Sequence, residues 1–384
     1  MGFKPTYLSL FSGIGGLDYG LEAAGFDNVG CIEWDKEACS NLILNNQWEV
    51  FQGDIRSIPA DRLRRKLGFR KGQLDLIVGG PPCQSYSKSS FWAEGIKRGY
   101  KDKRGKLIDE YLSYVEEFLP KVFLIENVPG FVYEGQSGGM KSLKRFLNRL
   151  KKDKRTSYEI SFQVINCADW GIPQRRERVF IVGNRLGVEF EFPEKKYSDP
   201  SDTRVTGLLP YKTASDAFSG LDDSHIEEDL SVGGKWAELL PCVPPGENYQ
   251  FFTTNGDGPD LFEYRSRYWT FLLKLHPKKP SWTIQASPGS STGPFHWNNR
   301  KLSGRELARI QTIPDRIRLS GSRQTIQKLI GNAVPSLVGE ILGKNIKNQI
   351  FDIRVKRTYK LLPGQSQKIY RPRIKTHIPR EYRI

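Results

Sequence analysis

Short apolar runs alternate with helix-like segments along the first half of the chain, and this rhythm limits the possible folds. Strand-like runs occur at 6–11, 29–34, 74–80, 121–128 and 178–183. Helical patterns lie between several of them, at 35–45, 107–119 and 138–150. Such alternation is typical of βαβ units around a mostly parallel sheet, in which ligands bind at the carboxyl ends of the strands. We therefore predict an α/β fold with a Rossmann-like sheet.

The rhythm stops after about residue 185, which predicts a second, smaller domain. Residues 186–300 are rich in Pro, Gly, Ser and Asp and show no long periodicity, as expected for an irregular, mostly β domain. A helical pattern resumes at 303–313, and another apolar stretch follows at 334–346. A chain of 384 residues is also too long for one ordinary core. The predicted domains are 1–185, completed by about 320–350, and 186–319, followed by a tail at 351–384.

The charge of the chain is unevenly distributed. The net charge is +16, but residues 187–264 hold 16 acidic and 5 basic residues, so the remainder carries +27. A polyanionic partner such as nucleic acid should therefore contact that remainder, although a basic, solvated surface is the alternative. The tail holds ten Lys or Arg against two acids. We expect it to be solvated and partly disordered, and its role is open.

Cysteine and histidine usage argues against structural cross-links. The five cysteines are an odd number without a C-x-x-C pair, and the four histidines are scattered, so we expect neither a disulfide framework nor a metal site. This pattern indicates a reducing, intracellular setting. No window approaches the roughly 18 continuous apolar residues of a membrane span, so no membrane association is expected.

A glycine-rich turn, "FSGIGG" at 11–16, follows the first predicted strand. Its glycines would let a ligand approach the backbone closely. Glu33 ends the next strand, where an acidic side chain can hold ribose hydroxyls, and Trp34 offers a flat face for adenine. "GDI" at 53–55 ends the third strand with another acid. These residues predict an adenosine-containing cofactor. A nicotinamide cofactor fits them nearly as well, and a turn without a ligand is the alternative.

Cys83 lies in "GGPPCQSYS" (79–87), a proline-stiffened loop just after the strand at 74–80. A thiol there cannot pack like an ordinary core cysteine, and hydroxyls and basic residues nearby favour the reactive thiolate. Cys31 and Cys39, by contrast, are expected to be buried structural thiols. The position predicts a nucleophile.

Two further motifs end or begin strands at the same edge of the predicted sheet. Glu126 and Asn127 follow "VFLI", where partial desolvation suits a carboxyl group to general-acid catalysis, and a helix cap or ion pair is the alternative. In "QRRERVFIVG" (174–183), Arg176 and Arg178 could hold a carbonyl oxygen or a phosphate. Surface ion pairing is the alternative for these arginines.

The ordered series "FSGIGG", "IEWD", "GDI", "GGPPCQSYS", "ENV", "QRRER", "RELARIQTIPD" and "IGNAVP" resembles the cytosine-C5-specific DNA methyltransferase family of bacterial restriction-modification type. The resemblance spans about residues 6 to 345. It implies an S-adenosylmethionine-dependent enzyme of Rossmann-like fold with a target-recognition domain. It also implies that Cys83 adds to carbon 6 of a flipped-out cytosine, Glu126 contacts ring nitrogen 3, and Arg178 holds the exocyclic oxygen, with Arg176 as a further catalytic candidate.

The resemblance also assigns binding residues. Ten positions would hold S-adenosylmethionine and its product S-adenosylhomocysteine, without a metal: Phe11, Ile14, Gly15, Glu33, Trp34, Asp54, Ile55, Pro81, Leu107 and Asn332. The acidic segment 187–264 is expected to be scaffold, and 265–300 is expected to read the DNA. Six residues are DNA-binding candidates: Ser87, Arg104, Arg265, Arg267, Gln285 and Ser287.

The resemblance implies double-stranded DNA as substrate, a monomer on DNA, and a prokaryotic cytoplasmic, nucleoid-associated protein. It also allows a cognate restriction endonuclease that acts on the same site. Two alternatives stay open at this point. One is a tRNA cytosine-5 methyltransferase, since a branch of this family acts on tRNA, and the other is a non-catalytic DNA-binding relic.

Overall fold

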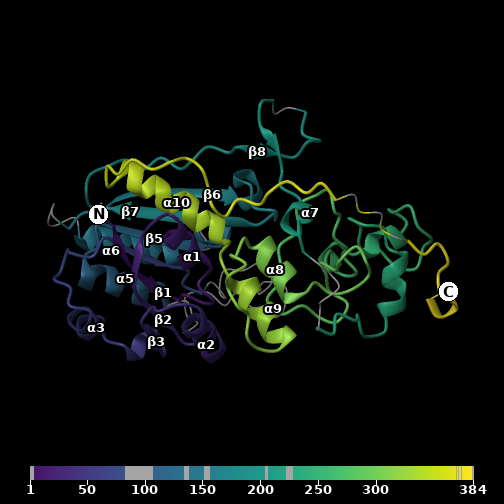
Figure 1. Cartoon of the computed structure of the whole chain (residues 1–384), viewed down its shortest axis with the longest axis horizontal. Helices are drawn as coiled ribbons and strands as arrows, with labels where there is room; N and C mark the ends of the chain where they lie inside the picture. Colours follow the sequence, from purple (N-terminus) through teal and green to yellow (C-terminus); the bar gives the residue numbers. More distant parts are fainter. Residues whose placement is uncertain are drawn as a thin grey trace. The chain divides into compact units, whose positions relative to one another are not determined.

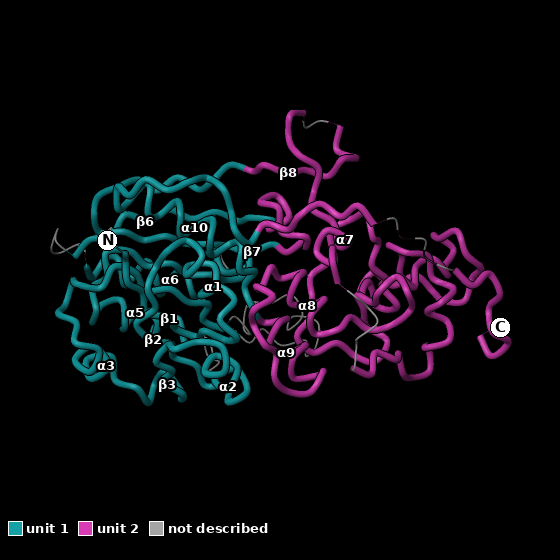
Figure 2. The backbone as a smooth tube through the Cα atoms, in the orientation of Figure 1, with its two compact units in different colours: residues 1–166, 177–194, 333–361 teal, residues 167–176, 195–332, 362–384 magenta. Residues whose placement is uncertain are grey.

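The computed structural model describes residues 4–82, 107–133, 138–150, 156–203, 206–221, 228–368, 370, 372 and 374–382. The chain divides into two compact units, and each is assembled from separated stretches of sequence (Figure 2). Unit 1 comprises Met1–Asn166, Glu177–Glu194 and Ala333–Leu361, and unit 2 comprises Cys167–Arg176, Lys195–Asn332 and Leu362–Ile384. The predicted domains, with bounds at residues 185, 319 and 350, were defined by function. They stay a prediction, because a compact unit does not by itself show which part of the chain recognises DNA.

Unit 1 is built on a seven-stranded sheet of order β3-β2-β1-β4-β5-β7-β6 (Figure 1). The strands are Thr6–Leu10 (β1), Asp27–Glu33 (β2), Val50–Gln52 (β3), Leu76–Gly79 (β4), Val122–Asn127 (β5), Glu159–Asn166 (β6) and Glu177–Asn184 (β7). The pairs among β1 to β5 are parallel, whereas β7 runs antiparallel to both β5 and β6. The predicted α/β fold with a mostly parallel sheet is confirmed.

Helices cover both faces of this sheet (Figure 1). Helices α3 (Ala60–Lys66), α5 (Leu107–Phe118) and α6 (Gly138–Leu150) bury one large hydrophobic cluster against alternate strand residues such as Leu8 and Leu10. Tyr7, which precedes Leu8, points to the opposite face, where its hydroxyl donates to the carbonyl of Asp18 in α1 (Gly16–Ala23). Helix α1 packs there against α10 (Ser336–Gln349). Helix α2 spans Lys36–Asn45.

A glycine allows the close crossing of α1 and α10. A Cβ atom on Gly20 would lie 2.0 Å from the carbonyl oxygen of Ser336 and 2.6 Å from the backbone nitrogen of Glu340. Real Cβ atoms do not approach backbone atoms so closely. The last regular helix of unit 1 therefore packs on the first one because residue 20 has no side chain.

Unit 2 is irregular, as expected from its composition, but its β content is small. Its regular strands among the described residues are Tyr197–Ser198 (β8) and Leu209–Pro210 (β9), joined by a few isolated bridges. Its helices are α7 (Ala214–Ala217), α8 (Gly304–Ile310) and α9 (Arg323–Asn332), with several 3₁₀ turns. Prolines and glycines are unfavourable within strands and interrupt longer runs of β pairing here. Much of the core is formed by an aromatic-rich cluster around Tyr249, Phe252 and Leu272.

The described residues of the C-terminal tail make specific contacts with the rest of the chain. Many of its side chains are exposed, as expected, and from residue 362 onward the tail belongs to unit 2. The amide of Ser366 donates to Asp216 (2.7 Å) and that of Lys375 donates to the carbonyl of Pro241 (3.0 Å). Tyr382 stacks on Trp236, with ring centroids 5.5 Å apart. These backbone bonds were not predictable because they need no particular tail sequence.

Within unit 1 the carboxylate of Glu340 holds the segment that follows α10. Glu340 is fully buried and accepts hydrogen bonds from Lys344 Nζ (2.7 Å), the Lys360 amide (2.8 Å) and the Leu361 amide (2.9 Å). All three groups are donors and need an acceptor, and the Lys344 ammonium also needs a counter-charge. The side chain therefore fixes the point at which the chain leaves unit 1.

Replacing Glu340 with glutamine is expected to lower the free energy of unfolding by about 3–5 kcal/mol, the usual cost of breaking a buried ion pair. The amide group would turn one NH₂ toward a donor and would leave the Lys344 ammonium buried without its counter-charge. Urea denaturation followed by circular dichroism measures the change. The exposed Glu189 offers the matched control, since E189Q should change stability by less than about 0.5 kcal/mol. Equal stabilities of E340Q and E189Q would contradict this role for Glu340.

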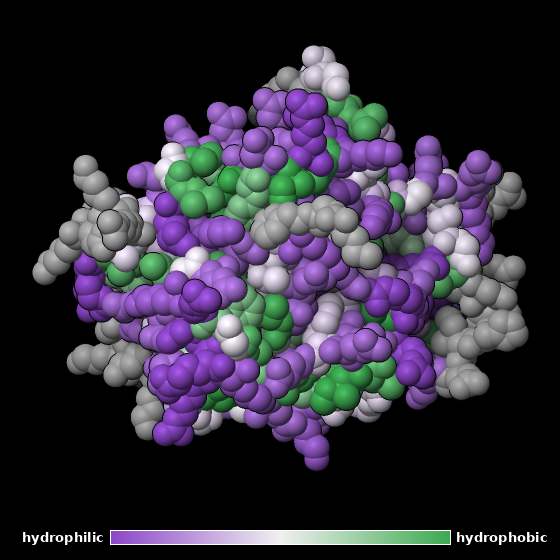
Figure 3. Space-filling model, turned by 60° about the vertical axis from the view of Figure 1, so that its left-hand side comes forward, coloured by the Kyte–Doolittle hydropathy of each residue, from purple (hydrophilic) through white to green (hydrophobic). Residues whose placement is uncertain are grey.

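The surface is mainly hydrophilic on the face drawn in Figure 3, where hydrophobic residues form small separate patches. Among the residues that the structure describes, none of the helices has the length and apolar character needed to cross a membrane.

Candidate active site

The predicted glycine-rich turn leads from β1 into α1. Phe11, Gly13 and Gly15 all have left-handed backbone conformations, with φ of 56°, 55° and 85°. A Cβ atom on Gly13 would meet no atom within 4 Å, so the turn leaves open space beside this residue. Ile14 is buried beneath the turn. The turn thus presents bare backbone at the carboxyl end of β1, as the sequence predicted.

Glu33 ties this turn to the end of β2. Its Oε2 accepts the Gly13 amide (2.7 Å), and its Oε1 accepts the amides of Trp34 and Asp35 (both 2.9 Å). Burial raises the pKa of Glu33, and these three amides act in the opposite direction. Oε2 accepts only one of them, so it retains a lone pair for a hydroxyl donor. A ribose hydroxyl is the ligand chemistry that this acceptor fits.

Other predicted cofactor residues lie at the same edge of the sheet. Trp34 exposes 75% of its surface, which leaves the face of its ring available to a flat ligand. Asp54 caps the 3₁₀ turn Ile55–Ser57. The Arg56 side chain donates hydrogen bonds to its carboxylate, which lowers the pKa of Asp54 to about 2. Ile55 packs into the core cluster, and Leu107 packs against it. The Arg56 partner was not predicted.

Asp18 is a buried carboxyl group directly below the turn, and the predicted mechanism does not use it. Only 1% of its surface is exposed, and burial raises its pKa to about 7. Its neighbours include the side chains of Ser9, Tyr7 and Glu33. The folded protein therefore favours the protonated form of this group near neutral pH.

The D18N variant is expected to lose much of the pH dependence of stability between pH 5 and 8. A carboxyl group whose pKa is about 7 in the folded protein and has an ordinary value of 3.8 stabilises the fold fully below the lower pKa, and this stabilisation disappears as the pH rises through the higher one. Asp18 should account for a fall on the order of 2–3 kcal/mol over this range in the wild type. Urea unfolding at both pH values measures it, with the exposed Asp260 substituted (D260N) as control. An equal fall in D18N and D260N would exclude Asp18 as the source.

The ends of β4 and β5 place the proline loop that leads to Cys83 beside Glu126 and Asn127. Asn127 Nδ2 donates to the carbonyl of Pro81 (3.1 Å), which fixes the start of the proline loop against β5. A Cβ atom on Gly80 would lie 3.0 Å from Glu126 Oε2, so the glycine allows the carboxylate to lie against the backbone that leads to Cys83. The two motifs, about 45 residues apart in sequence, are therefore neighbours in space.

Glu126 and Arg178 form a shielded ion pair. Arg178 Nε lies 2.9 Å from Glu126 Oε1, and the two side chains expose only 18% and 12% of their surface. Strand β7 runs antiparallel to β5, so its first residues lie at the edge where β5 ends. A carboxylate and a guanidinium side by side can contact adjacent polar atoms of one planar ring. The sequence predicted both residues but left their pairing as one of several alternatives.

Three predicted site residues, Cys83, Ser87 and Arg104, lie outside the described residues. The other cysteines, Cys31, Cys39, Cys167 and Cys242, are all buried. Burial raises the pKa of Cys39 to about 11 and also raises that of Cys31 and Cys242. Burial therefore holds these three thiols in the unreactive protonated form.

Unit 2 holds Arg176 and Asn332. Arg176 is buried, and its Nη2 donates to the carbonyl of Gly331 (3.3 Å). Asn332 is exposed at the end of α9. Arg176 therefore contacts the residue directly before Asn332, although 155 residues separate Arg176 from Gly331 in the sequence.

Two buried glutamines connect this region to the predicted DNA-reading segment, and sequence reasoning missed them. Gln174 Oε1 accepts the amide of Ile284 (3.1 Å), while its Nε2 donates to Gln311 Oε1 (3.1 Å). Gln311 in turn donates to the carbonyl of Ile330 (2.9 Å). Both glutamines occur in the motifs "QRRER" and "RELARIQTIPD", so the motifs themselves contained the signal.

The DNA-reading candidates of unit 2 lie in or near exposed turns. Arg265 is exposed and pairs with Glu263 (2.8 Å), and the guanidinium of Arg267 lies over the Tyr268 ring. Gln285 is half-buried and its carbonyl accepts from Gln327 (2.5 Å), whereas Ser287 is exposed. The four residues are accessible to different degrees, and their roles on DNA stay predictions.

No group of three or more His, Cys, Asp or Glu side chains suited to hold a metal ion occurs in the described part of the chain. The open backbone at Gly13, the Glu33 acceptor and the exposed Trp34 ring fit the adenosine part of S-adenosylmethionine.

Comparisons with known proteins agree with this geometry. Residues 6–348 match the family model described as C-5 cytosine-specific DNA methylase. The chain is 37% identical to the Type II methyltransferase M.SacI of Streptomyces achromogenes, over 91% of this chain and 94% of that protein. It is 34% identical to the Type II methyltransferase M.NgoFVII of Neisseria gonorrhoeae, over 86% and 83%.

A solved structure shows the same fold. The methyltransferase EhMeth of Entamoeba histolytica superposes with a TM-score of 0.62 at 18% identity, covering 90% of this chain and 99% of that one. The predicted resemblance is thus confirmed by the family model and by the relatives together. The chain therefore belongs to the C-5 cytosine-specific DNA methylase family and is a DNA cytosine-5-methyltransferase.

Proposed function

We propose that this enzyme methylates carbon 5 of one cytosine within a specific double-stranded DNA sequence, through a transient bond between Cys83 and carbon 6 of the flipped-out base. The observation that carries this proposal is the Glu126–Arg178 pair at the carboxyl edge of the sheet, against the backbone that leads to Cys83. Cys83 follows Gly80 by three residues, and three residues span at most about 11 Å, so one pyrimidine held by the ion pair is within the reach of this thiol.

The chemistry follows from what each side chain can do. The Cys83 thiolate forms a bond to carbon 6, and the displaced ring electrons move toward nitrogen 3 and the exocyclic oxygen. Glu126 donates a hydrogen bond or proton to nitrogen 3, and Arg178 holds the oxygen, so both stabilise the charge that develops. Carbon 5 becomes nucleophilic. After methylation a water molecule accepts the carbon-5 proton, and the freed electron pair forms the carbon 5–carbon 6 double bond. The carbon–sulfur bond then breaks, which restores the thiolate, and nitrogen 3 returns its proton to Glu126.

S-adenosylmethionine supplies the electrophilic methyl group, and ten residues are proposed to hold it. Glu33 takes the ribose hydroxyls, Trp34 and Ile55 take the faces of the adenine, and Asp54 takes its amino group. The others, Phe11, Ile14, Gly15, Pro81, Leu107 and Asn332, complete the pocket. The three backbone amides on Glu33 support this assignment, because they fix the carboxylate before the ligand arrives.

DNA is recognised in this proposal by two kinds of contact. Ser87 and Arg104 bind phosphates near the nucleophile, while Arg265, Arg267, Gln285 and Ser287 contact the target from the segment 265–300. The base must leave the stack, because a thiol cannot reach carbon 6 inside a duplex. The relatives named as Type II methyltransferases come from bacteria and support a role in a restriction-modification system. We further propose that the enzyme acts as a monomer on DNA in a prokaryotic cell, where it protects sites that a cognate restriction endonuclease cleaves.

Bisulfite sequencing of DNA from cells that express the protein tests the activity and its sequence context together. The expected result is protection of one cytosine in every copy of a short sequence. The purified enzyme should also form a covalent complex with a duplex carrying 5-fluorocytosine at that position, because fluorine cannot leave as the proton does. Labelled-methyl transfer to tRNA but not to duplex DNA would contradict the proposal. Absence of both the adduct and methyl transfer would identify a non-catalytic relic.

A further inference from the structure

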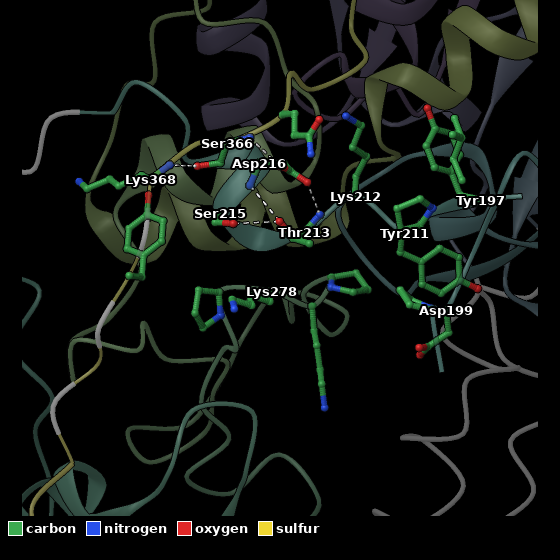
Figure 4. Close-up of a pocket in the computed structure, with 18 of the residues that line it drawn as sticks. Tyr197, Asp199, Tyr211, Lys212, Thr213, Ser215, Asp216, Lys278, Ser366 and Lys368 are labelled. Atoms are coloured by element: carbon green, nitrogen blue, oxygen red, sulfur yellow. Dashed lines mark hydrogen bonds between the residues drawn. The ribbon is translucent and has the colours of Figure 1, made fainter. Parts of the chain in front are cut away.

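A cavity of about 630 Å³ lies in unit 2 (Figure 4). Four segments form its walls: the β8–β9 region with α7, residues 277–280, Arg175, and the tail at 365–370. The tail is part of this site because Ser366 is bound to Asp216, one of the lining residues. The cavity therefore exists only when the tail is in place.

The lining contains five cationic side chains but two carboxylates: Arg175, Lys212, Lys278, Lys279 and Lys368, against Asp199 and Asp216. Both carboxylates already have donors. Asp199 accepts from the Ser201 amide (3.0 Å) and Ser201 hydroxyl (2.7 Å) and pairs with Arg175. Asp216 accepts the amides of Thr213 (2.9 Å) and Ser366 (2.7 Å). Neither is available to neutralise the lysines.

Three of the lysines have no counter-charge in an ion pair among the residues that the structure describes. Lys278, Lys279 and Lys368 are exposed, and none of them forms an ion pair with a residue that the structure describes. Lys368 Nζ lies 5.2 Å from the centroid of the Tyr370 ring, which keeps the ammonium at the cavity wall. Lys212 Nζ is 3.4 Å from the Gly364 carbonyl. The cavity is thus a site with excess positive charge, and it suits an anionic ligand.

The cavity is continuous with the start of the proposed DNA-reading segment. The Arg175 amide donates to the carbonyl of Ser281 (2.7 Å), and Thr283 Oγ1 donates to the carbonyl of Arg175 (2.8 Å). The Arg175 guanidinium lies over the rings of Tyr211 and Trp282, 5.9 and 5.3 Å from their centroids. A polymer that contacts residues after 283 would therefore pass close to the lysines at 278 and 279.

We propose that this cavity binds phosphodiester groups of duplex DNA that flanks the recognised sequence, with Lys278, Lys279 and Lys368 as the contacts. The inference rests on the proposed function and adds a non-sequence-specific anchor to it. Lysine ammonium groups bind phosphates as point charges and do not distinguish bases. The anchor also gives the basic tail a role, since Lys368 and the wall at 365–370 come from it.

The test is the salt dependence of DNA binding by the variant K278A/K279A/K368A. Two duplexes are compared, one with the methylated sequence found by bisulfite sequencing and one with that sequence scrambled. Each phosphate contact contributes about 0.9 to the slope of log K against log salt, so the slope should fall by about two to three units. The loss of affinity should be the same on both duplexes. The control variant K71A/K141A/K144A removes three exposed lysines of unit 1 and should keep the wild-type slope.

The charge-conserving variant K278R/K279R/K368R should restore the slope. This result would show that the positive charge of the three side chains, and not their shape, determines the salt dependence of DNA binding. An unchanged slope in the alanine variant overturns the proposal. A loss confined to the duplex with the methylated sequence also overturns it, since that pattern indicates base contacts. Adduct formation on 5-fluorocytosine DNA at low salt should persist in the alanine variant. If the wild-type enzyme itself forms no adduct, the proposed function fails, whatever the lysines do.

Discussion

Replacing Cys83 with alanine is expected to abolish methyl transfer, with a fall in the single-turnover rate of more than about 10³-fold. Carbon 5 of cytosine is a poor nucleophile, and it becomes reactive only while sulfur occupies carbon 6. Without the thiol, the remaining groups can bind the base but cannot break the aromaticity of its ring. The rate is measured with labelled S-adenosylmethionine, and the covalent adduct with 5-fluorocytosine DNA is measured on denaturing gels.

A buried cysteine supplies the control for this experiment. Cys242 belongs to the hydrophobic cluster of unit 2, and its Sγ lies 3.5 Å from the His377 carbonyl. C242A should lower stability modestly but retain both methyl transfer and the adduct. Binding of duplex DNA by C83A should remain close to that of the wild type, because the phosphate and base contacts are unchanged. Methyl transfer by C83A at the wild-type rate would rule out the covalent route.

The α/β core was predictable because its elements have a buried side that repeats along the sequence. The helices expected at 35–45, 107–119 and 138–150 appear as Lys36–Asn45, Leu107–Phe118 and Gly138–Leu150. Strand β6 was missed. Its sequence alternates Ile160, Phe162 and Val164 with polar residues, which is a strand pattern, but it is not the continuous apolar run on which the prediction of the buried strands was based.

The site was predictable where motifs lie at strand ends and unpredictable where pairs form across the chain. Glu33 and Glu126 follow apolar runs, so their positions at the edge of the sheet could be inferred from sequence. Their partners could not. The bond from Ile284 to Gln174 spans 110 residues, and the packing of Tyr382 beside Trp236 depends on the path of the whole tail. Such contacts depend on the three-dimensional arrangement of the chain and leave no local periodicity.

The E126Q variant is expected to lose about 10²–10⁴-fold in methyl-transfer rate, the usual contribution of a general acid. Glutamine keeps the size of the side chain and its hydrogen-bonding capacity toward Arg178, but it cannot deliver a proton to nitrogen 3 of the ring. Binding of S-adenosylhomocysteine, measured by calorimetry, should be unchanged. Glu177 is the control, because it directly precedes Arg178 in the "QRRER" motif but is exposed, and E177Q should react at close to the wild-type rate.

The adduct assay distinguishes the two roles that Glu126 can have. If the carboxyl group acts on the ring, E126Q slows adduct formation as much as it slows methyl transfer, because sulfur addition and protonation of nitrogen 3 occur in one step. If its contribution is only to orient Arg178, at 2.9 Å, the amide oxygen can accept the same hydrogen bond and the rate should be nearly unaffected. A wild-type rate in E126Q would therefore assign the stabilisation of the developing charge to Arg178. The R178A variant would then show the larger loss of methyl-transfer rate.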